Sequence, residues 1–274
     1  MTKKHDDWQD AFAATFNTRV QSLNKSIKDI IKDMTSQNDH LVLIAGKSAA
    51  GKSASLMGMR DPEGVMYLNC ENNKKLPFKS KFKEFTITDP YQVYEAFTKA
   101  EDMPEIHTIV IDTATYLMDM FETVHVITSP NTMKAWGDYA QFFKKLMSQY
   151  VAKSTKNVVF LAHTMDILNE SEMAMETLVK VKGSLMNQGI ESFFSTVLSA
   201  KKVQLSKLSN YSNGLLTITD EEEALGFKYV FQTKLTKDTV NERMRSSLGM
   251  WSIQETYIDN SVQHVIDRLR DYYV

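Results

Sequence analysis

The segment Gly46-Lys47-Ser48-Ala49-Ala50-Gly51-Lys52-Ser53 constrains the fold of this 274-residue chain more than any other feature. It matches the phosphate-binding pattern G-x-x-x-x-G-K-[ST] in full. The apolar run Leu41–Ala45 precedes it, and Ala54–Met59 follows as the expected first turn of a helix. Glycines let successive N–H groups face a phosphate, and a helix N-terminus adds partial positive charge. We therefore predict that Gly46 to Ala54 cradle the phosphates of a nucleotide.

Two side chains of this motif suggest ATP and Mg²⁺ as cofactors. Lys52 offers a mobile cation to the β- and γ-phosphates, and the Ser53 hydroxyl suits a Mg²⁺ ligand. A carboxylate at the end of another buried strand should complete the metal site, and Ile109-Val110-Ile111-Asp112 supplies one. The alternative for Asp112 is a helix N-cap, in competition with two nearby threonines. We predict that Ser53 and Asp112 hold the metal.

Hydrolysis of a nucleotide also needs a group that orients or deprotonates water. The run Val65–Glu71 is an apolar strand that ends in a carboxylate. Strand ends collect at the ligand edge of an open α/β sheet, so Glu71 is predicted to face the γ-phosphate. The alternative is a surface glutamate that leads into the basic loop Asn72–Lys83.

Short, unbroken apolar runs separated by helical stretches predict an α/β fold with a mostly parallel sheet buried on both faces. The runs are Leu41–Ala45, Val65–Leu68, Ile109–Ile111 and Val158–Ala162, and Tyr139–Val151 is a helical stretch.

The last third predicts antiparallel strands instead. Phe193–Leu205, Leu215–Thr219 and Phe227–Phe231 have strand character, with Asp220–Gly226 as a turn, and Gln254–Val274 is expected to be an amphipathic helix.

The N-terminal segment, residues 1–38, differs from the domain expected over residues 39–274. From Phe16 to Met34 its apolar residues recur in steps of four and three, which predicts a helical seam. Such a helix either packs on its own domain or docks on a neighbouring subunit as an oligomerisation arm. The spacing does not distinguish these alternatives.

Composition and charge limit the partners and the cellular compartment that we expect for this chain. The net charge is −2, so a polyanionic partner must be met by a local patch. The single cysteine, Cys70, excludes an internal disulfide, and no histidine or cysteine spacing indicates a metal cluster. The N-terminus lacks the apolar core of a signal peptide, and no apolar run is long enough for a membrane span. We expect a cytoplasmic protein without membrane contact.

Four local matches in this order resemble the RecA-like recombinase family, and in particular its short phage members, the RecA-core recombination and single-strand annealing ATPases. They are the Walker A loop Gly46–Ser53, the strand Tyr67–Glu71 with its catalytic glutamate, the Walker B strand Thr108–Thr113, and Asn157–His163. In the last strand, the resemblance implies that the terminal polar residue, His163, senses the γ-phosphate. Recombinases commonly have glutamine at this position, and the histidine resembles the phage and circadian-clock branches instead. It also implies a RecA-like P-loop NTPase core over about Leu41 to Met250.

The resemblance further implies two DNA-binding loops, at Phe121–Trp136 and Met165–Gly183. The second departs from expectation because it carries four acidic residues against two lysines, and phosphate contacts dominate nucleic-acid affinity. The densest basic cluster instead lies between Lys74 and Lys83, with Phe78 and Phe82 interleaved. Such a segment either holds single strands by stacking or is a solvated loop.

The same resemblance implies a homo-oligomer, a ring or a filament, in which a basic residue of one subunit stabilises the γ-phosphate charge of its neighbour. Lys234 and Lys237 lie in the corresponding strand, and Arg243 and Arg245 are rivals.

Three functions follow. The first is a Mg²⁺-dependent, DNA-stimulated ATPase that acts on single-stranded DNA in recombination, repair or replication. The second is a RecA-fold ATPase that regulates a protein partner. The third is a nucleotide-dependent assembly module with little turnover, against which Glu71 argues.

Overall fold

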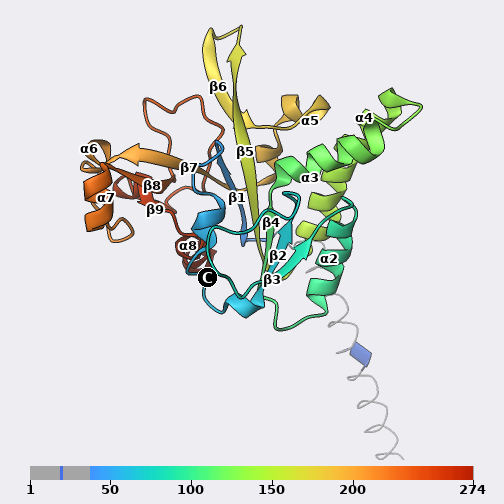
Figure 1. The fold of residues 1–274 in the computed structure, drawn as a ribbon, viewed down its shortest axis with the longest axis horizontal. Helices are drawn as coiled ribbons and strands as arrows, with labels where there is room; N and C mark the ends of the chain where they lie inside the picture. The colour runs from blue at the N-terminus through green and yellow to red at the C-terminus, as the bar shows by residue number, and fades with distance from the viewer. Residues whose placement is uncertain (1–18, 21–37, 274) are drawn as a thin grey trace, which may run out of the picture. The chain divides into compact units, whose positions relative to one another are not determined.

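The computed structural model describes residues 19–20 and 38–273. The chain divides into two units, residues 1–37 and residues 38–274. Apart from residues 19 and 20, the predicted helical seam from Phe16 to Met34 lies outside the described residues. Everything below concerns the second unit, which contains every motif that the sequence singles out (Figure 1).

A nine-stranded sheet forms the centre of this unit. Along the sheet the strands follow the order β3-β2-β4-β5-β1-β7-β8-β9, and β6 pairs with the far end of β5. Their bounds are β1 Leu41–Gly46, β2 Val65–Asn69, β3 Lys83–Thr86, β4 Thr108–Asp112, β5 Asn157–Asn169, β6 Ala174–Val179, β7 Thr196–Gln204, β8 Phe227–Gln232 and β9 Tyr257–Asp259.

The sheet is parallel from β3 to β7 and antiparallel from β7 to β9. This arrangement confirms the predicted α/β class, the mostly parallel sheet and the C-terminal antiparallel extension. It is the architecture of a P-loop NTPase core. Because parallel strands end at one edge, the carboxyl ends of β1, β2 and β4 are brought together there, and β5 passes this edge at His163.

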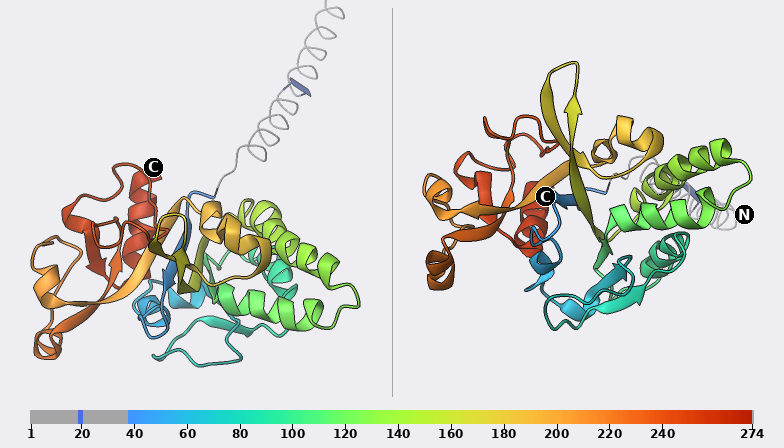
Figure 2. Two further views of the ribbon diagram at one scale, coloured as in Figure 1. Left: turned by 90° about the horizontal axis from the view of Figure 1, so that it is seen from above. Right: turned by 45° about the horizontal axis from the view of Figure 1, so that its top comes forward.

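Strict alternation along the buried strands divides the core into two layers. In β1, Leu43 and Ala45 belong to one layer, whereas Val42 and Ile44 belong to the other. The first layer packs on α2 (Gln92–Glu101), α3 (Ala114–Phe121) and α4 (Thr132–Lys145), and the second on α8 (Val262–Tyr273). Figure 2 shows these helix groups on opposite sides of the sheet. Period-two side chains that are apolar on both faces explain why the strand runs are unbroken.

Shorter elements complete the described part of the chain. Three further α-helices are α5 (Gly183–Gln188), α6 (Leu205–Leu208) and α7 (Asp220–Leu225). Four 3₁₀ turns are η1 (Ser53–Leu56), η2 (Pro62–Gly64), η5 (Ile190–Phe193) and η6 (Gln254–Thr256), and two π-helical turns are η3 (Glu122–Val126) and η4 (Leu146–Val151).

Three details of the last third differ from the sequence prediction. Leu215–Thr219 is not a strand, and the expected turn is the helix α7. Thr219 and Glu222 form a capping box there, so local hydrogen bonds select a helix where acidic residues indicated a solvated turn. The expected C-terminal helix is instead a 3₁₀ turn, the strand β9 and α8, because Tyr257 and Ile258 extend the sheet beside β8.

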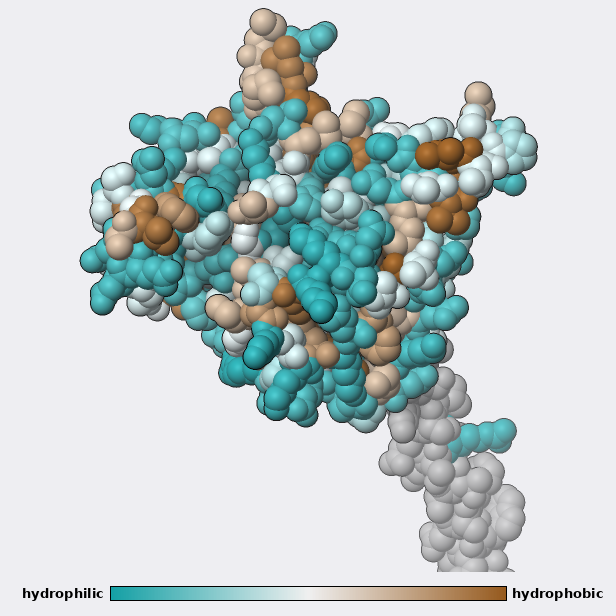
Figure 3. All heavy atoms as spheres, viewed as in Figure 1, coloured by the Kyte–Doolittle hydropathy of each residue, from teal (hydrophilic) through white to brown (hydrophobic). Residues whose placement is uncertain are grey.

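The two segments expected as DNA-binding loops are regular structure. Phe121–Trp136 belongs to the helical hairpin of α3, η3 and α4, and Met165–Val179 belongs to the β5–β6 hairpin. Both project from the body of the unit in Figure 1, and hydrophobic side chains gather at their tips in Figure 3. Ile127, Met133, Leu168 and Met173 are among the exposed apolar residues.

Candidate nucleotide site

Sheet register places the sequence-predicted site residues at one edge. Gly46 at the end of β1 lies opposite His163 in β5, and Asn69 at the end of β2 lies opposite Asp112 at the end of β4. Glu71 follows β2 by two residues. The structure therefore brings Lys52, Ser53, Glu71, Asp112 and His163 into one cleft of about 340 Å³, lined on one side by residues 48–54.

Lys52 is buried and turned back onto its own loop. Its Nζ donates to the carbonyl oxygens of Gly46 at 3.0 Å and Lys47 at 2.9 Å, and lies 3.2 Å from Nδ1 of His163. Burial lowers the pKa of Lys52 to about 8, against the opposing charges of Asp112 and Glu71. A phosphate that entered the cleft would give this amine a stronger partner than two carbonyls.

Asp112 is almost completely buried and has two hydroxyl partners. Ser53 Oγ donates to its Oδ2 at 2.7 Å, and Tyr67 OH donates to the same oxygen at 2.8 Å. Its Oδ1 is buried with no hydrogen-bond partner, and burial raises the pKa of this carboxyl. The helix cap is Thr113, whose side chain accepts from the backbone N–H of Tyr116, so Asp112 is free of capping.

An unpartnered carboxylate oxygen beside a serine hydroxyl fits a Mg²⁺ site. Both ligands are hard oxygen donors, and Mg²⁺ in nucleotide sites takes few protein ligands besides phosphates and water. Ser53 and Asp112 would hold the ion, which would neutralise phosphate charge when bound.

Glu71 is held between two donors. His163 Nε2 lies 3.1 Å from its Oε1, and Lys74 Nζ lies 2.8 Å from its Oε2. The His163 hydrogen bond, together with Lys74, lowers the pKa of Glu71 to about 2, although burial opposes the shift. Since Lys52 can only donate to Nδ1 of His163, Nε2 carries the hydrogen given to Glu71. A continuous chain of contacts thus runs from Lys52 through His163 to Glu71.

The loop backbone is braced from the antiparallel extension. Gly51 has φ +88°, and a Cβ there would lie 2.8 Å from Asn260 Nδ2. Asn260 Nδ2 donates to the Gly51 carbonyl at 2.9 Å. Only glycine combines this backbone conformation with so close an approach, which explains the residue type in the motif.

The helix expected after the loop is much shorter than the motif predicts. Ser53–Leu56 is a single 3₁₀ turn that ends at Met57 in extended conformation. The contribution of a helix dipole at the phosphates is correspondingly small, so the backbone N–H groups and Lys52 provide most of the positive potential.

Lys234 and Lys237 do not lie in a strand, contrary to the sequence prediction, because β8 ends at Gln232. Lys234 Nζ donates to the carbonyl of Trp251 at 3.3 Å. Lys237 lines a second cavity of about 730 Å³, which borders residues 46–50 of the phosphate loop. Neither lysine lines the cleft that holds Lys52 and Glu71.

The β5–β6 hairpin is tied to the phosphate loop at its base. Lys47 Nζ forms an ion pair with Asp166 Oδ2 at 2.6 Å, and Thr177 Oγ1 donates to Asp166 Oδ1 at 2.7 Å. This ion pair neutralises Asp166, one of the four acidic residues that argue against nucleic-acid binding by this segment.

Sequence reasoning missed four contributors to the cleft. They are Tyr67, Lys74, Tyr229 and Asn260. Tyr67 and Lys74 lie on either side of the end of β2, which the sequence had identified. The alternation of side chains along β2 could have indicated Tyr67, which lies two residues before the end of that strand. Tyr229 and Asn260 come from the C-terminal extension, and nothing local in their sequence points to a phosphate loop far away in the chain.

Comparison with known families agrees with this geometry. An AAA domain family matches residues 38–225, which is more than half of the chain and includes Lys52, Ser53, Glu71, Asp112 and His163. The chain belongs to this family of AAA-type P-loop ATPases. No curated protein matches the chain. Family membership supports nucleotide binding and hydrolysis by this AAA domain, and it leaves open the RecA-like phage branch that the motifs resemble.

Among the described residues, every helix is too short or too polar to cross a membrane.

Proposed function

We propose that this AAA-family protein hydrolyses ATP with Mg²⁺ at the cleft formed by Lys52, Ser53, Glu71, Asp112 and His163. The observation that carries the proposal is the convergence of these five side chains from four segments at one sheet edge. A cation, a metal-ligand pair and a water-orienting carboxylate are the parts that phosphoryl transfer requires.

Each group has a distinct task in this proposal. Lys52 leaves the Gly46 and Lys47 carbonyls for the β- and γ-phosphate oxygens. Glu71 accepts a hydrogen bond from the attacking water and orients it. Its ionised carboxylate also accepts the proton of the attacking water as a general base.

His163 connects the two ends of the site. It contacts Lys52 through Nδ1 and Glu71 through Nε2. When Lys52 moves onto a phosphate, His163 loses its contact with the lysine, and the position of the imidazole ring then depends on the γ-phosphate. This supports the sensing role that the family resemblance implies for His163.

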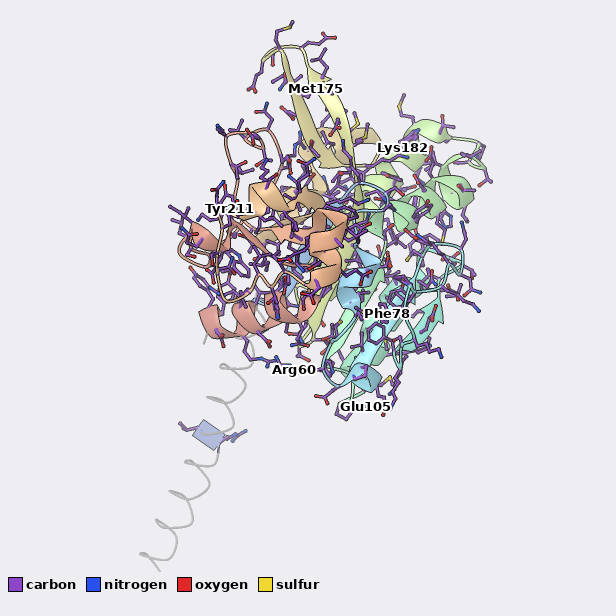
Figure 4. All side chains as sticks on the ribbon, turned by 60° about the vertical axis from the view of Figure 1, so that its left-hand side comes forward. Arg60, Phe78, Glu105, Met175, Lys182 and Tyr211 are labelled. Carbon is purple, nitrogen blue, oxygen red and sulfur yellow. The ribbon has the colours of Figure 1, made fainter. Side chains whose placement is uncertain are left out.

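The proposed setting is single-stranded DNA in phage-type recombination, repair or replication, within the cytoplasm. The motif resemblance supports this setting, whereas the acidic β5–β6 hairpin favours the alternative, an ATPase that regulates a protein partner. Figure 4 shows the hairpin that carries Met175 well apart from the β2–β3 connection that carries Phe78. The basic cluster of that connection is therefore a separate surface, and we propose it as the DNA contact.

We expect wild-type protein with ATP to bind labelled single-stranded DNA with an affinity that falls steeply as salt rises. Each DNA phosphate that the protein no longer neutralises lowers the slope of log affinity against log salt by about 0.7. Lys79→Gln/Lys81→Gln should therefore weaken binding and lower the slope by about 1.4, whereas Lys99→Gln on α2 should not. Unchanged DNA binding in the double variant would refute the basic surface. ATP turnover without any DNA binding would favour the protein-partner alternative.

We also propose that the site is shared between subunits of a homo-oligomer, with Lys234 or Lys237 acting on the ATP of a neighbour. Both lysines lie outside the cleft of their own chain. A cation supplied in trans acts when charge develops on the γ-phosphate, so its loss should lower turnover more than ATP affinity.

Mixing two inactive variants tests this arrangement. Lys52→Ala protein and a Lys234→Ala/Lys237→Ala double variant should each be inactive alone. Together they form some interfaces with an intact phosphate loop and intact lysines, so part of the activity should return. Co-assembly without recovery of activity would place these lysines outside catalysis.

A further inference from the structure

The cleft extends beyond the phosphate-binding residues to an aromatic ring of the antiparallel extension. Tyr229, in the middle of β8, lines the same cleft as Lys52 and Glu71. A Cβ at Gly51 would lie 3.0 Å from Cδ1 of Tyr229, so the ring packs directly beside the turn of the loop. The ring therefore lies next to the phosphate site, although it is distant in sequence.

Tyr229 is the accessible aromatic ring of this cleft. The described residues that line it include two aromatic side chains, Tyr67 and Tyr229. Tyr67 is only 2% exposed and its hydroxyl is bound to Asp112. Tyr229 is 36% exposed, so its surface is open to a ligand. No hydrogen bond or ion pair in the catalytic cluster uses this side chain.

Neighbouring side chains fix the ring. Lys202 Nζ lies 5.2 Å from the Tyr229 centroid and 4.8 Å from that of Phe227, and the two rings meet edge to face at 5.9 Å. Lys202 lines the neighbouring cavity and not the phosphate cleft, so its cation covers Tyr229 from that side. A ring held in this way loses little conformational freedom when a ligand stacks on it.

We propose that Tyr229 is the platform on which the base of the nucleotide stacks, and that it gives the site a preference for purine over pyrimidine triphosphates. The proposal rests on the nucleotide-binding function proposed above. Stacking needs only a flat π-face, and a purine offers a larger face than a pyrimidine. The β7–β9 extension then has a direct task, since it supplies the base-binding wall while the parallel strands supply the phosphate site.

Binding of nucleotides with and without a base tests this proposal. Calorimetry would measure the affinity of Mg²⁺ complexes of ATP, CTP and inorganic tripolyphosphate for wild-type protein and for Tyr229→Ala. We expect Tyr229→Ala to weaken ATP by at least about fivefold, the lower limit for loss of one stacked base. CTP should weaken less, and tripolyphosphate should be unchanged. Tyr229→Phe should behave as wild type, because the ring and not the hydroxyl is used.

Two controls keep the outcomes separate. Tyr272→Ala on α8 removes an exposed tyrosine outside the cleft and should leave all three affinities unchanged. ATP and tripolyphosphate weakened equally by Tyr229→Ala would indicate a distorted phosphate loop and would overturn the proposal, as would unchanged ATP affinity. If tripolyphosphate and ATP fail to bind wild-type protein, the proposed nucleotide function itself fails.

Discussion

Replacing Lys52 by alanine is expected to lower ATP turnover by at least about 10²-fold, the usual cost of a preorganised group that stabilises developing charge. ATP affinity should also fall, by about tenfold or more, because a charge-assisted hydrogen bond to phosphate is lost. The loop itself should survive, since the lysine amine contributes hydrogen bonds only to Gly46, Lys47 and His163. Steady-state phosphate release and calorimetric titration with ATP measure the two effects.

The lowered pKa of Lys52 gives the same prediction a signature in pH. In the protein without nucleotide, Lys52 has a pKa of about 8. A bound phosphate raises this pKa, because the negative charge of the phosphate favours the protonated amine. ATP affinity should therefore be fully developed below pH 8 and decline above it, with proton uptake on binding near pH 8 to 9. This decline should be absent in Lys52→Ala. Lys99→Ala, on the exposed surface of α2, should match wild type in turnover and pH profile, and near-normal turnover in Lys52→Ala would refute the assignment.

Glu71→Gln is expected to separate binding from hydrolysis. Glutamine preserves the size of the side chain but not its charge, so turnover should fall by roughly 10² to 10⁴-fold, the usual range for such a group. ATP affinity should stay within a few-fold of wild type, because Glu71 contacts His163 and Lys74 and not the loop. Rapid-quench measurement of phosphate release checks this.

Its matched control is Glu95→Gln, which changes an exposed glutamate on α2 and should leave turnover unaltered. Normal turnover in Glu71→Gln would make Glu71 a bystander, and His163 would then be the next residue to test as the group that positions water.

The catalytic cluster could be predicted because its residues belong to a fixed motif or follow the apolar runs of buried strands. An apolar run that stops at a polar residue marks a sheet edge, and Lys52, Asp112, Glu71 and His163 all meet this rule or belong to a fixed motif. Parallel pairing then forces these ends together, as the register of Gly46 with His163 and of Asn69 with Asp112 illustrates.

The rest depends on contacts that have no local pattern. Asn260 reaches Gly51 only because β9 pairs with β8, and a three-residue strand within an amphipathic segment resembles part of a helix. Helix α7 was not predicted, because the run of acidic residues indicated a solvated turn. The capping box between Thr219 and Glu222 that stabilises the helix lies within this run. The prediction that Lys234 and Lys237 lie in a strand was wrong because β8 ends at Gln232, before either lysine.

The identity of the nucleotide that remains bound after incubation with Mg²⁺ and ATP tests the central claim most directly. Wild-type protein, Lys52→Ala and Glu71→Gln would each be separated rapidly from free nucleotide, and the bound fraction would be resolved by chromatography. The account predicts mostly ADP on wild type, mostly intact ATP on Glu71→Gln, and little nucleotide on Lys52→Ala. ADP on Glu71→Gln in the wild-type proportion, or full occupancy of Lys52→Ala, would contradict it.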